Sequence, residues 1–218
     1  LPIANLLECA VVAFWVRRRE GDLERARSLP RVSRAALGAT LVGCALSGLL
    51  AAPVLAARTA APAVDAWATW YGAHVLGLVI VATLVVCSFQ KHVRMVPQEW
   101  PARADYLACL GLLLLTCWLV FSQQHYPVLF LAFLPLLLLA WRQGLSGMVV
   151  GVMVLAITSG LPAAQGEGPF GLVSTNDPTV RLLFWQMYIA SACVLAYSSA
   201  VSLTQRQQLE SRLLRSEA

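Results

Sequence analysis

Apolar runs of roughly 20 residues recur along the chain between short polar stretches, and each is close to the length that carries an α-helix through ~30 Å of hydrocarbon. Few stretches alternate apolar with polar residues over strand length, which disfavours an outer-membrane β-barrel. The pattern therefore predicts an all-α, polytopic transmembrane bundle of about seven spans, over residues 1–16, 35–57, 67–90, 104–121, 127–141, 144–161 and 182–204.

The basic residues predict how this bundle is oriented. If the spans cross alternately, one side of the membrane receives only Arg58 and Arg181. The opposite side receives Arg17, Arg18, Arg19, Arg25, Arg27, Arg31, Arg34, Lys91, Arg94, Arg103, Arg142, Arg206, Arg212 and Arg215. By the positive-inside rule the crowded side is cytoplasmic. The preference for Arg over Lys is typical of GC-rich bacterial genes, so we expect a bacterial inner-membrane protein with a cytoplasmic C-terminus.

The two ends of the chain carry further expectations. Alternate crossing places Leu1 on the outer side, so we expect at least one further span ahead of it. Residues 205–218 continue the last apolar span as a polar helix, and Leu209 and Leu213 lie four positions apart on one seam of the kind that parallel coiled coils use. We therefore divide the chain into a membrane bundle, 1–204, and a connector, 205–218.

Composition excludes several classes of function. With 59% hydrophobic and only 12% charged residues, the chain is not a soluble domain. The six cysteines fall within the predicted spans without CxxC or Cys/His zinc spacing, so we expect no metal and no cofactor. The basic loop 17–34 also holds acidic residues, which favours contact with anionic lipid over nucleic acid.

Polar residues at membrane depth are the candidate functional groups, because a charge there is costly. Asn5 and Glu8 are three positions apart and are expected to share a helix face. Trp67, Trp70, Tyr71 and His74 follow helical spacing and form one stripe near the outer boundary. That stripe is either an aromatic belt with an interior histidine or the lining of an outward-opening pocket for a small ligand.

A direct pair between Glu8 and His74 is not expected from their positions in the spans. Glu8 lies nine residues before Arg17, about 13 Å from the inner boundary, whereas His74 lies seventeen residues before Lys91, about 25 Å from it. A difference of roughly 12 Å exceeds the reach of an ion pair.

Two connections complete the set of candidates. The longest outer loop, 162–181, contains Gly168, Pro169 and Phe170, and we expect an exposed, turn-rich segment that carries binding or merely tolerates insertions. Gln186, expected one turn into the last span, either bonds a neighbouring helix or faces a pocket. At the inner boundary Arg142 is expected to anchor the chain at the headgroups and Gly144 to allow a sharp reversal.

Taken together, these motifs resemble a known family. The order of Asn5, Glu8 and Arg17-Arg18, then Trp67 and Trp70 with Gly72 and Gly77, then Pro135 with Arg142-Gln143-Gly144, then 166–170 and Gln186, is similar to the first type of membrane-associated sensor domain, the MASE family. The resemblance implies a sensory input module ahead of a histidine kinase or a GGDEF diguanylate cyclase. It also implies a homodimer and a cytoplasmic output domain, and it leaves open whether the stimulus is a small molecule, a lipid or a partner membrane protein.

Two other functions are weighed against a sensor. A secondary transporter, or a transporter-like binding protein, would also place Glu8 and His74 within the membrane. An intramembrane enzyme would need a nucleophile and a base, and neither Ser47, Ser159 nor the cysteines stand at an interpretable spacing from a histidine. We therefore expect a sensor without catalytic residues in this segment.

Overall fold

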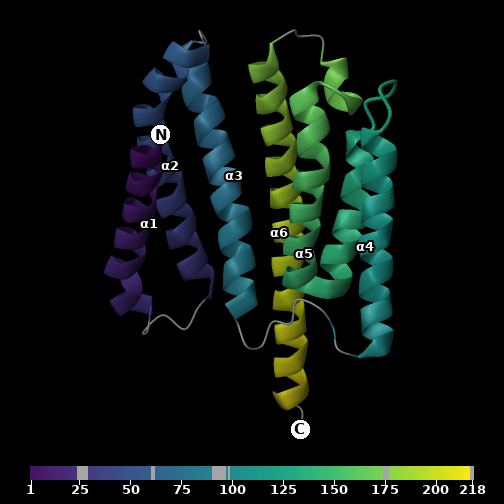
Figure 1. The fold of residues 1–218 in the computed structure, drawn as a ribbon. Coiled ribbons are helices and arrows are strands. Elements are labelled where there is room, and N and C mark those ends of the chain that lie inside the picture. The colour runs from purple at the N-terminus through teal and green to yellow at the C-terminus, as the bar shows by residue number, and fades with distance from the viewer. Residues whose placement is uncertain (24–28, 60–61, 90–96, 98, 174–176, 217–218) are drawn as a thin grey trace. The chain divides into compact units, whose positions relative to one another are not determined.

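A computed structural model describes the chain apart from residues 24–28, 60–61, 90–96, 98, 174–176 and 217–218. Within the helices only the backbone is described at 16–17, 19–23, 29–35, 85–89, 204–205 and 207–216. The elements are α1 Pro2–Leu23, α2 Leu29–Thr59, α3 Ala63–Phe89, α4 Trp100–Phe121, η1 Leu129–Ala132, α5 Phe133–Gln165, η2 Gly168–Leu172 and α6 Pro178–Ser216 (Figure 1). Every described element is helical, so the predicted all-α class is confirmed.

Helix length and composition agree with a membrane location. Among the described residues, five helical stretches are long and apolar enough to cross a bilayer, and Pro2–Trp15 of α1 is a shorter apolar helix. One of the five, Leu129–Leu172, has 44 residues and is twice the length that a single crossing needs. The polytopic helical architecture is therefore confirmed, while the count of about seven crossings stays a prediction.

The long apolar stretch reverses direction at Gly144. This residue has φ 63° and ψ −142° inside α5, a conformation that residues with a Cβ rarely adopt. The two limbs, 133–143 and 145–165, pack against each other, because a Cβ on Gly151 would lie 2.7 Å from Leu136 Cδ1 and 3.0 Å from Leu139 Cδ2. The sharp reversal predicted at Gly144 is confirmed, and α5 is a helical hairpin.

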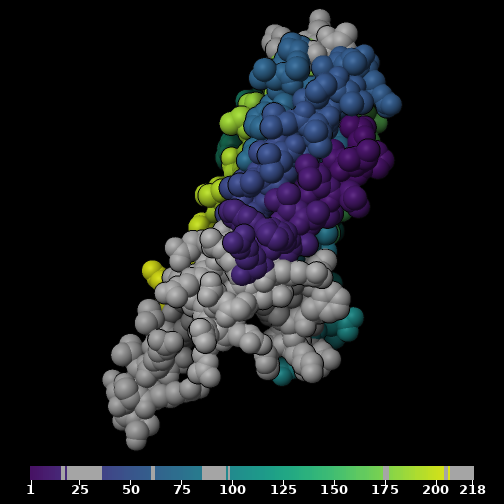
Figure 2. Space-filling model, turned by 90° about the vertical axis from the view of Figure 1, so that its left-hand side faces the viewer, coloured from purple at the N-terminus to yellow at the C-terminus, as the bar shows by residue number. Residues whose placement is uncertain are grey.

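Two compact units make up the chain, Leu1–Val79 and Ile80–Ala218. In the first, α1 lies along α2, as the purple and blue surfaces in Figure 2 show. A Cβ on Gly43 of α2 would lie 3.3 Å from Val12 Cγ2 and 3.5 Å from the Glu8 carbonyl oxygen, so α1 packs directly on this part of α2. The backbone of α3 lies farther from α2 than that of α1 does, and α3 contacts α2 through the long side chains of Trp67 and Trp70.

The second unit has its core between α4, the α5 hairpin and α6, where the fully buried side chains include Leu113, Leu136, Leu155 and Ile189. The segment between α5 and α6 differs from the expected exposed loop. Helix α5 continues to Gln165 and α6 begins at Pro178, so the connection is shorter than 162–181.

Gly168, Pro169 and Phe170, the residues expected in that exposed loop, are instead buried in the 3₁₀-helix η2. Phe170 is 0% exposed and packs against the rings of Phe121, Phe184 and Tyr188. The prediction of an exposed loop was wrong here because the tertiary burial of one aromatic ring folds the segment into the core.

The last helix runs without interruption from Pro178 to Ser216, 39 residues. Its apolar part, Pro178–Leu203, is a candidate membrane span, and the helix continues for more than ten residues beyond it. The side chains of Leu209 and Leu213 lie outside the described residues, so the coiled-coil seam and the division at residue 204 stay predictions.

Candidate functional site

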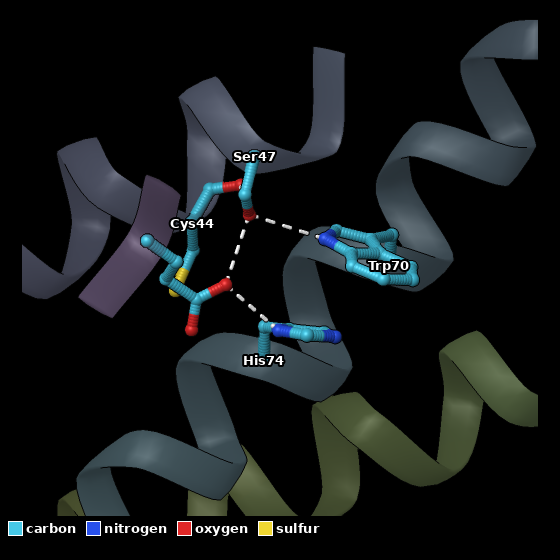
Figure 3. Close-up of polar contacts among 5 residues, drawn as sticks. Cys44, Ser47, Trp70 and His74 are labelled. Carbon is cyan, nitrogen blue, oxygen red and sulfur yellow. Dashed lines mark hydrogen bonds and ion pairs between the residues drawn. The ribbon is translucent and has the colours of Figure 1, made fainter. Parts of the chain in front are cut away.

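A buried carboxylate lies at the centre of the first unit. Glu8 of α1 is 4% exposed, and its Oε2 accepts a hydrogen bond of 2.9 Å from Ser47 Oγ of α2. Ser47 is fully buried and lies 3.0 Å from the carbonyl oxygen of Cys44, one turn earlier in the same helix. Figure 3 shows Cys44 and Ser47 on the same side of α2. A charge at this depth is stable only if hydrogen bonds or an opposite charge compensate for lost hydration.

His74 of α3 supplies the second contact to the carboxylate. Its Nδ1 lies 2.8 Å from Glu8 Oε2, and the two side chains are 23% and 5% exposed. Because an ionised carboxylate only accepts hydrogen bonds, Nδ1 carries the proton when Glu8 is ionised.

Trp70 closes the network on the α3 side. Its Nε1 donates a 3.1 Å hydrogen bond to Ser47 Oγ, and its ring stacks on His74 with the centroids 4.0 Å apart (Figure 3). One turn earlier, Trp67 stacks on Tyr71 at 5.0 Å and donates through Nε1 to the Ala45 carbonyl at 3.3 Å. The predicted stripe is therefore one face of α3, and it faces α2.

The contact between Glu8 and His74 contradicts the expectation that they lie at different depths. Helix α1 does not stop at Arg17 but continues at least to Leu23, and α3 is described as far as Phe89. The first arginine was a poor marker of the boundary because the helix continues for more than a turn beyond it.

The structure also describes other residues predicted from the sequence. Asn5 is exposed on α1, whereas Glu8, three positions on, is buried. Gln186 is buried in α6, two turns from its start rather than one. Pro135 is buried in the first turn of α5, where a proline costs no helical hydrogen bond. Both Gln186 and Pro135 belong to the second unit.

A second polar contact links α4 to the reversal of α5. Asp105 Oδ1 lies 3.2 Å from Arg142 Nη2, and its Oδ2 accepts a 3.2 Å hydrogen bond from Gln143 Nε2. The side chains of Arg142 and Asp105 are 55% and 31% exposed, so this is a contact at the surface of the unit. Sequence reasoning singled out Arg142 and missed Asp105, although an aspartate at the start of an apolar span on the same predicted side was a usable signal.

The second unit also contains hydrogen bonds that were not predicted. Trp185 Nε1 donates to Ser159 Oγ at 2.9 Å, and Ser159 donates to the Leu155 carbonyl at 2.7 Å. Tyr188 bonds the Leu129 carbonyl at 3.1 Å through its hydroxyl. These bonds satisfy polar groups inside the helix core, which is what a low-dielectric environment requires.

The network pairs a carboxylic acid with an imidazole. In the part of the chain that the structure describes, no three His, Cys, Asp or Glu side chains lie together as metal ligands would. The five cysteines with described side chains are free thiols, three of them buried.

These features define a polytopic helical membrane protein whose intramembrane polar groups are paired between helices. The MASE1 family model matches residues 1–208, so the chain belongs to this family of membrane-associated sensor domains. Comparison with curated proteins and with solved structures gave no match. MASE1 is a family of membrane sensory input domains, which confirms the resemblance and is consistent with a membrane sensor role.

Proposed function

We propose that this chain is the input half of a signalling protein in the bacterial inner membrane, with α6 leading into the cytoplasm to a histidine kinase or diguanylate cyclase. The four-residue network of Glu8, Ser47, Trp70 and His74 is proposed as the element that responds to the stimulus. The single observation that carries the proposal is the 2.8 Å contact between His74 and the buried Glu8 in a chain of the MASE1 family.

The network suits this role because it joins three helices through one carboxylate oxygen. Ser47 of α2 and His74 of α3 both contact Oε2 of Glu8 on α1. The network can be intact or broken. A stimulus that adds a proton, displaces His74 from Glu8 or competes for the Ser47 hydroxyl would bind these two arrangements unequally. Unequal binding is what shifts a two-state equilibrium.

Helix α3 offers a covalent route out of the first unit. It is continuous from Ala63 to Phe89, and the division between the two compact units falls within it, after Val79. A change in how Trp70 and His74 are held would therefore act on a rigid element that continues into the second unit, to which α6 belongs.

The proposal is tested by placing residues 1–218 ahead of a diguanylate cyclase domain and measuring cyclic di-GMP formation in membranes. We expect Ser47→Ala and Trp70→Phe each to change output at least threefold, because Ser47→Ala removes two hydrogen bonds of the network and Trp70→Phe removes one. Matched controls are Ser198→Ala, whose exposed hydroxyl donates to the Leu195 carbonyl of its own helix, and Trp118→Phe, whose side chain is 66% exposed.

The amount of each variant in the membrane is measured by immunoblot, so that output is compared per folded chain. Equal output from the two network variants and the two controls would overturn the role of the network. Unchanged cyclase activity in every variant, including a chain that lacks α1, would overturn the sensory coupling itself.

A further inference from the structure

An amphipathic groove lies on the second unit where the first limb of α5 meets α6. Its volume is about 480 Å³, within the usual range for small-ligand sites. Leu137, Leu138 and Trp141 line it from α5. From α6 it is lined by Ser199, Ser202, Leu203 and Arg206, which follow helical spacing and form one stripe of that helix.

The groove is apolar along its length and cationic at one end. Ser199 donates its hydroxyl to the Leu195 carbonyl of its own helix at 2.8 Å, so this hydroxyl needs no partner in the groove. The small serine side chain also leaves space beside the leucines that line the groove. Arg206 stands one turn beyond Ser202, and the 66% exposed Trp141 lies at the same groove. An indole and an arginine at the end of an apolar surface are typical of the lipid headgroup region.

The charges at this end distinguish two arginines. Arg142 contacts Asp105 at 3.2 Å, which neutralises it. Arg206 has no ion pair with any residue that the structure describes, and it is exposed. Among the residues that the structure describes, Arg206 is therefore a cation at the groove available for an anionic group, beside walls that fit an acyl chain.

We propose that this groove binds an anionic phospholipid, with its phosphate on Arg206 and Ser202 and an acyl chain against Leu137, Leu138 and Leu203. Because four lining residues belong to α6, the bound lipid contacts the helix that we propose as the output element. Lipid binding itself does not depend on that proposal, and it can be measured without an output domain.

The test is native mass spectrometry of the detergent-solubilised chain titrated with phosphatidylglycerol or phosphatidylcholine of identical acyl chains. We expect Arg206→Gln to weaken phosphatidylglycerol binding about fivefold, corresponding to ~1 kcal/mol for one basic side chain, and to leave phosphatidylcholine unchanged. Arg142→Gln, the matched control, is expected to stay within twofold of the unaltered chain. Leu138→Trp fills the groove and should weaken both lipids, whereas Leu134→Trp, 63% exposed on the same limb, should weaken neither.

Three results would overturn the inference. Equal losses of phosphatidylglycerol binding in Arg206→Gln and Arg142→Gln would show that the lipid is attracted by basic residues in general and not by Arg206 in the groove. Unaltered binding in Leu138→Trp would place the lipid elsewhere. A dimer that dissociates in Leu138→Trp, with no lipid retained by the unaltered chain, would show that a second copy of the chain occupies the groove.

Discussion

At the residue scale, the stability of the first unit depends on how the Glu8 charge is compensated. The carboxylate is nearly inaccessible, and its contacts include the Ser47 hydroxyl at 2.9 Å and the His74 ring at 2.8 Å. Breaking a buried pair by removing one partner costs more than replacing both, because the remaining charge is left without compensation.

His74→Phe keeps the ring that stacks on Trp70 and removes the contact to Glu8. We expect a loss of about 2–3 kcal/mol in the free energy of unfolding, somewhat below the value for a fully buried pair because His74 is 23% exposed. The double variant Glu8→Gln/His74→Phe should be more stable than His74→Phe alone, since an amide costs less to bury than an unpaired carboxylate. Reversible denaturation in mixed micelles measures both.

His125→Phe is the matched control for this substitution. His125 is exposed and outside the network, so its replacement should change the stability by less than ~0.5 kcal/mol. If the double variant were less stable than His74→Phe, compensation of charge would not be the reason for the pairing.

The sequence predicted three of the four network residues but not their contact. Glu8, Trp70 and His74 stand out because charged and aromatic side chains are conspicuous in apolar spans. Ser47 does not, since serine is frequent at helix interfaces in membranes and carries no signal by itself. The depth of Glu8 was misjudged because basic residues mark where a helix can leave the hydrocarbon, not where the helix ends.

At the scale of elements, the reversal of α5 depends on one backbone conformation. Gly144 has φ 63° and ψ −142°, and a Cβ placed there would meet nothing within 4 Å. The effect of Gly144→Ala is therefore backbone strain alone. We expect about 1–3 kcal/mol of destabilisation, measured by the same denaturation assay.

Gly111 of α4 provides the control, because it also has open space around it but has no positive φ. Gly111→Ala should be neutral or slightly stabilising, as alanine favours a helix over glycine. Equal effects at the two positions would show that the φ of residue 144 is not what makes the reversal.

Element types were more predictable than the way elements pack. Long apolar runs specify helices because hydrocarbon leaves the backbone no other hydrogen-bond partners, and Gly144 marked the reversal correctly. The η2 segment was misjudged because glycine and proline predict a turn but not its burial. Phe170 is buried through rings distant in sequence, at Phe121, Phe184 and Tyr188.

At the scale of the whole molecule, α6 combines a candidate membrane span and a polar extension in one helix. A rigid helix transmits rotation and translation along its length, because the position of each residue around the helix axis fixes that of the next residue. If α6 is the output element, the rotation of its C-terminal end about the helix axis should affect the output more than the length of the helix does.

This predicts a dependence on helical phase. Inserting one alanine after Thr204 rotates everything beyond it by about 100° around the helix axis, whereas inserting seven changes the phase by only about 20°. In the cyclase fusion we expect the single insertion to abolish the response to Ser47→Ala and the seven-residue insertion to retain it, as measured by cyclic di-GMP formation. A response that declines steadily with the length of insertion, irrespective of phase, would contradict transmission through a rigid helix and would favour a flexible tether instead.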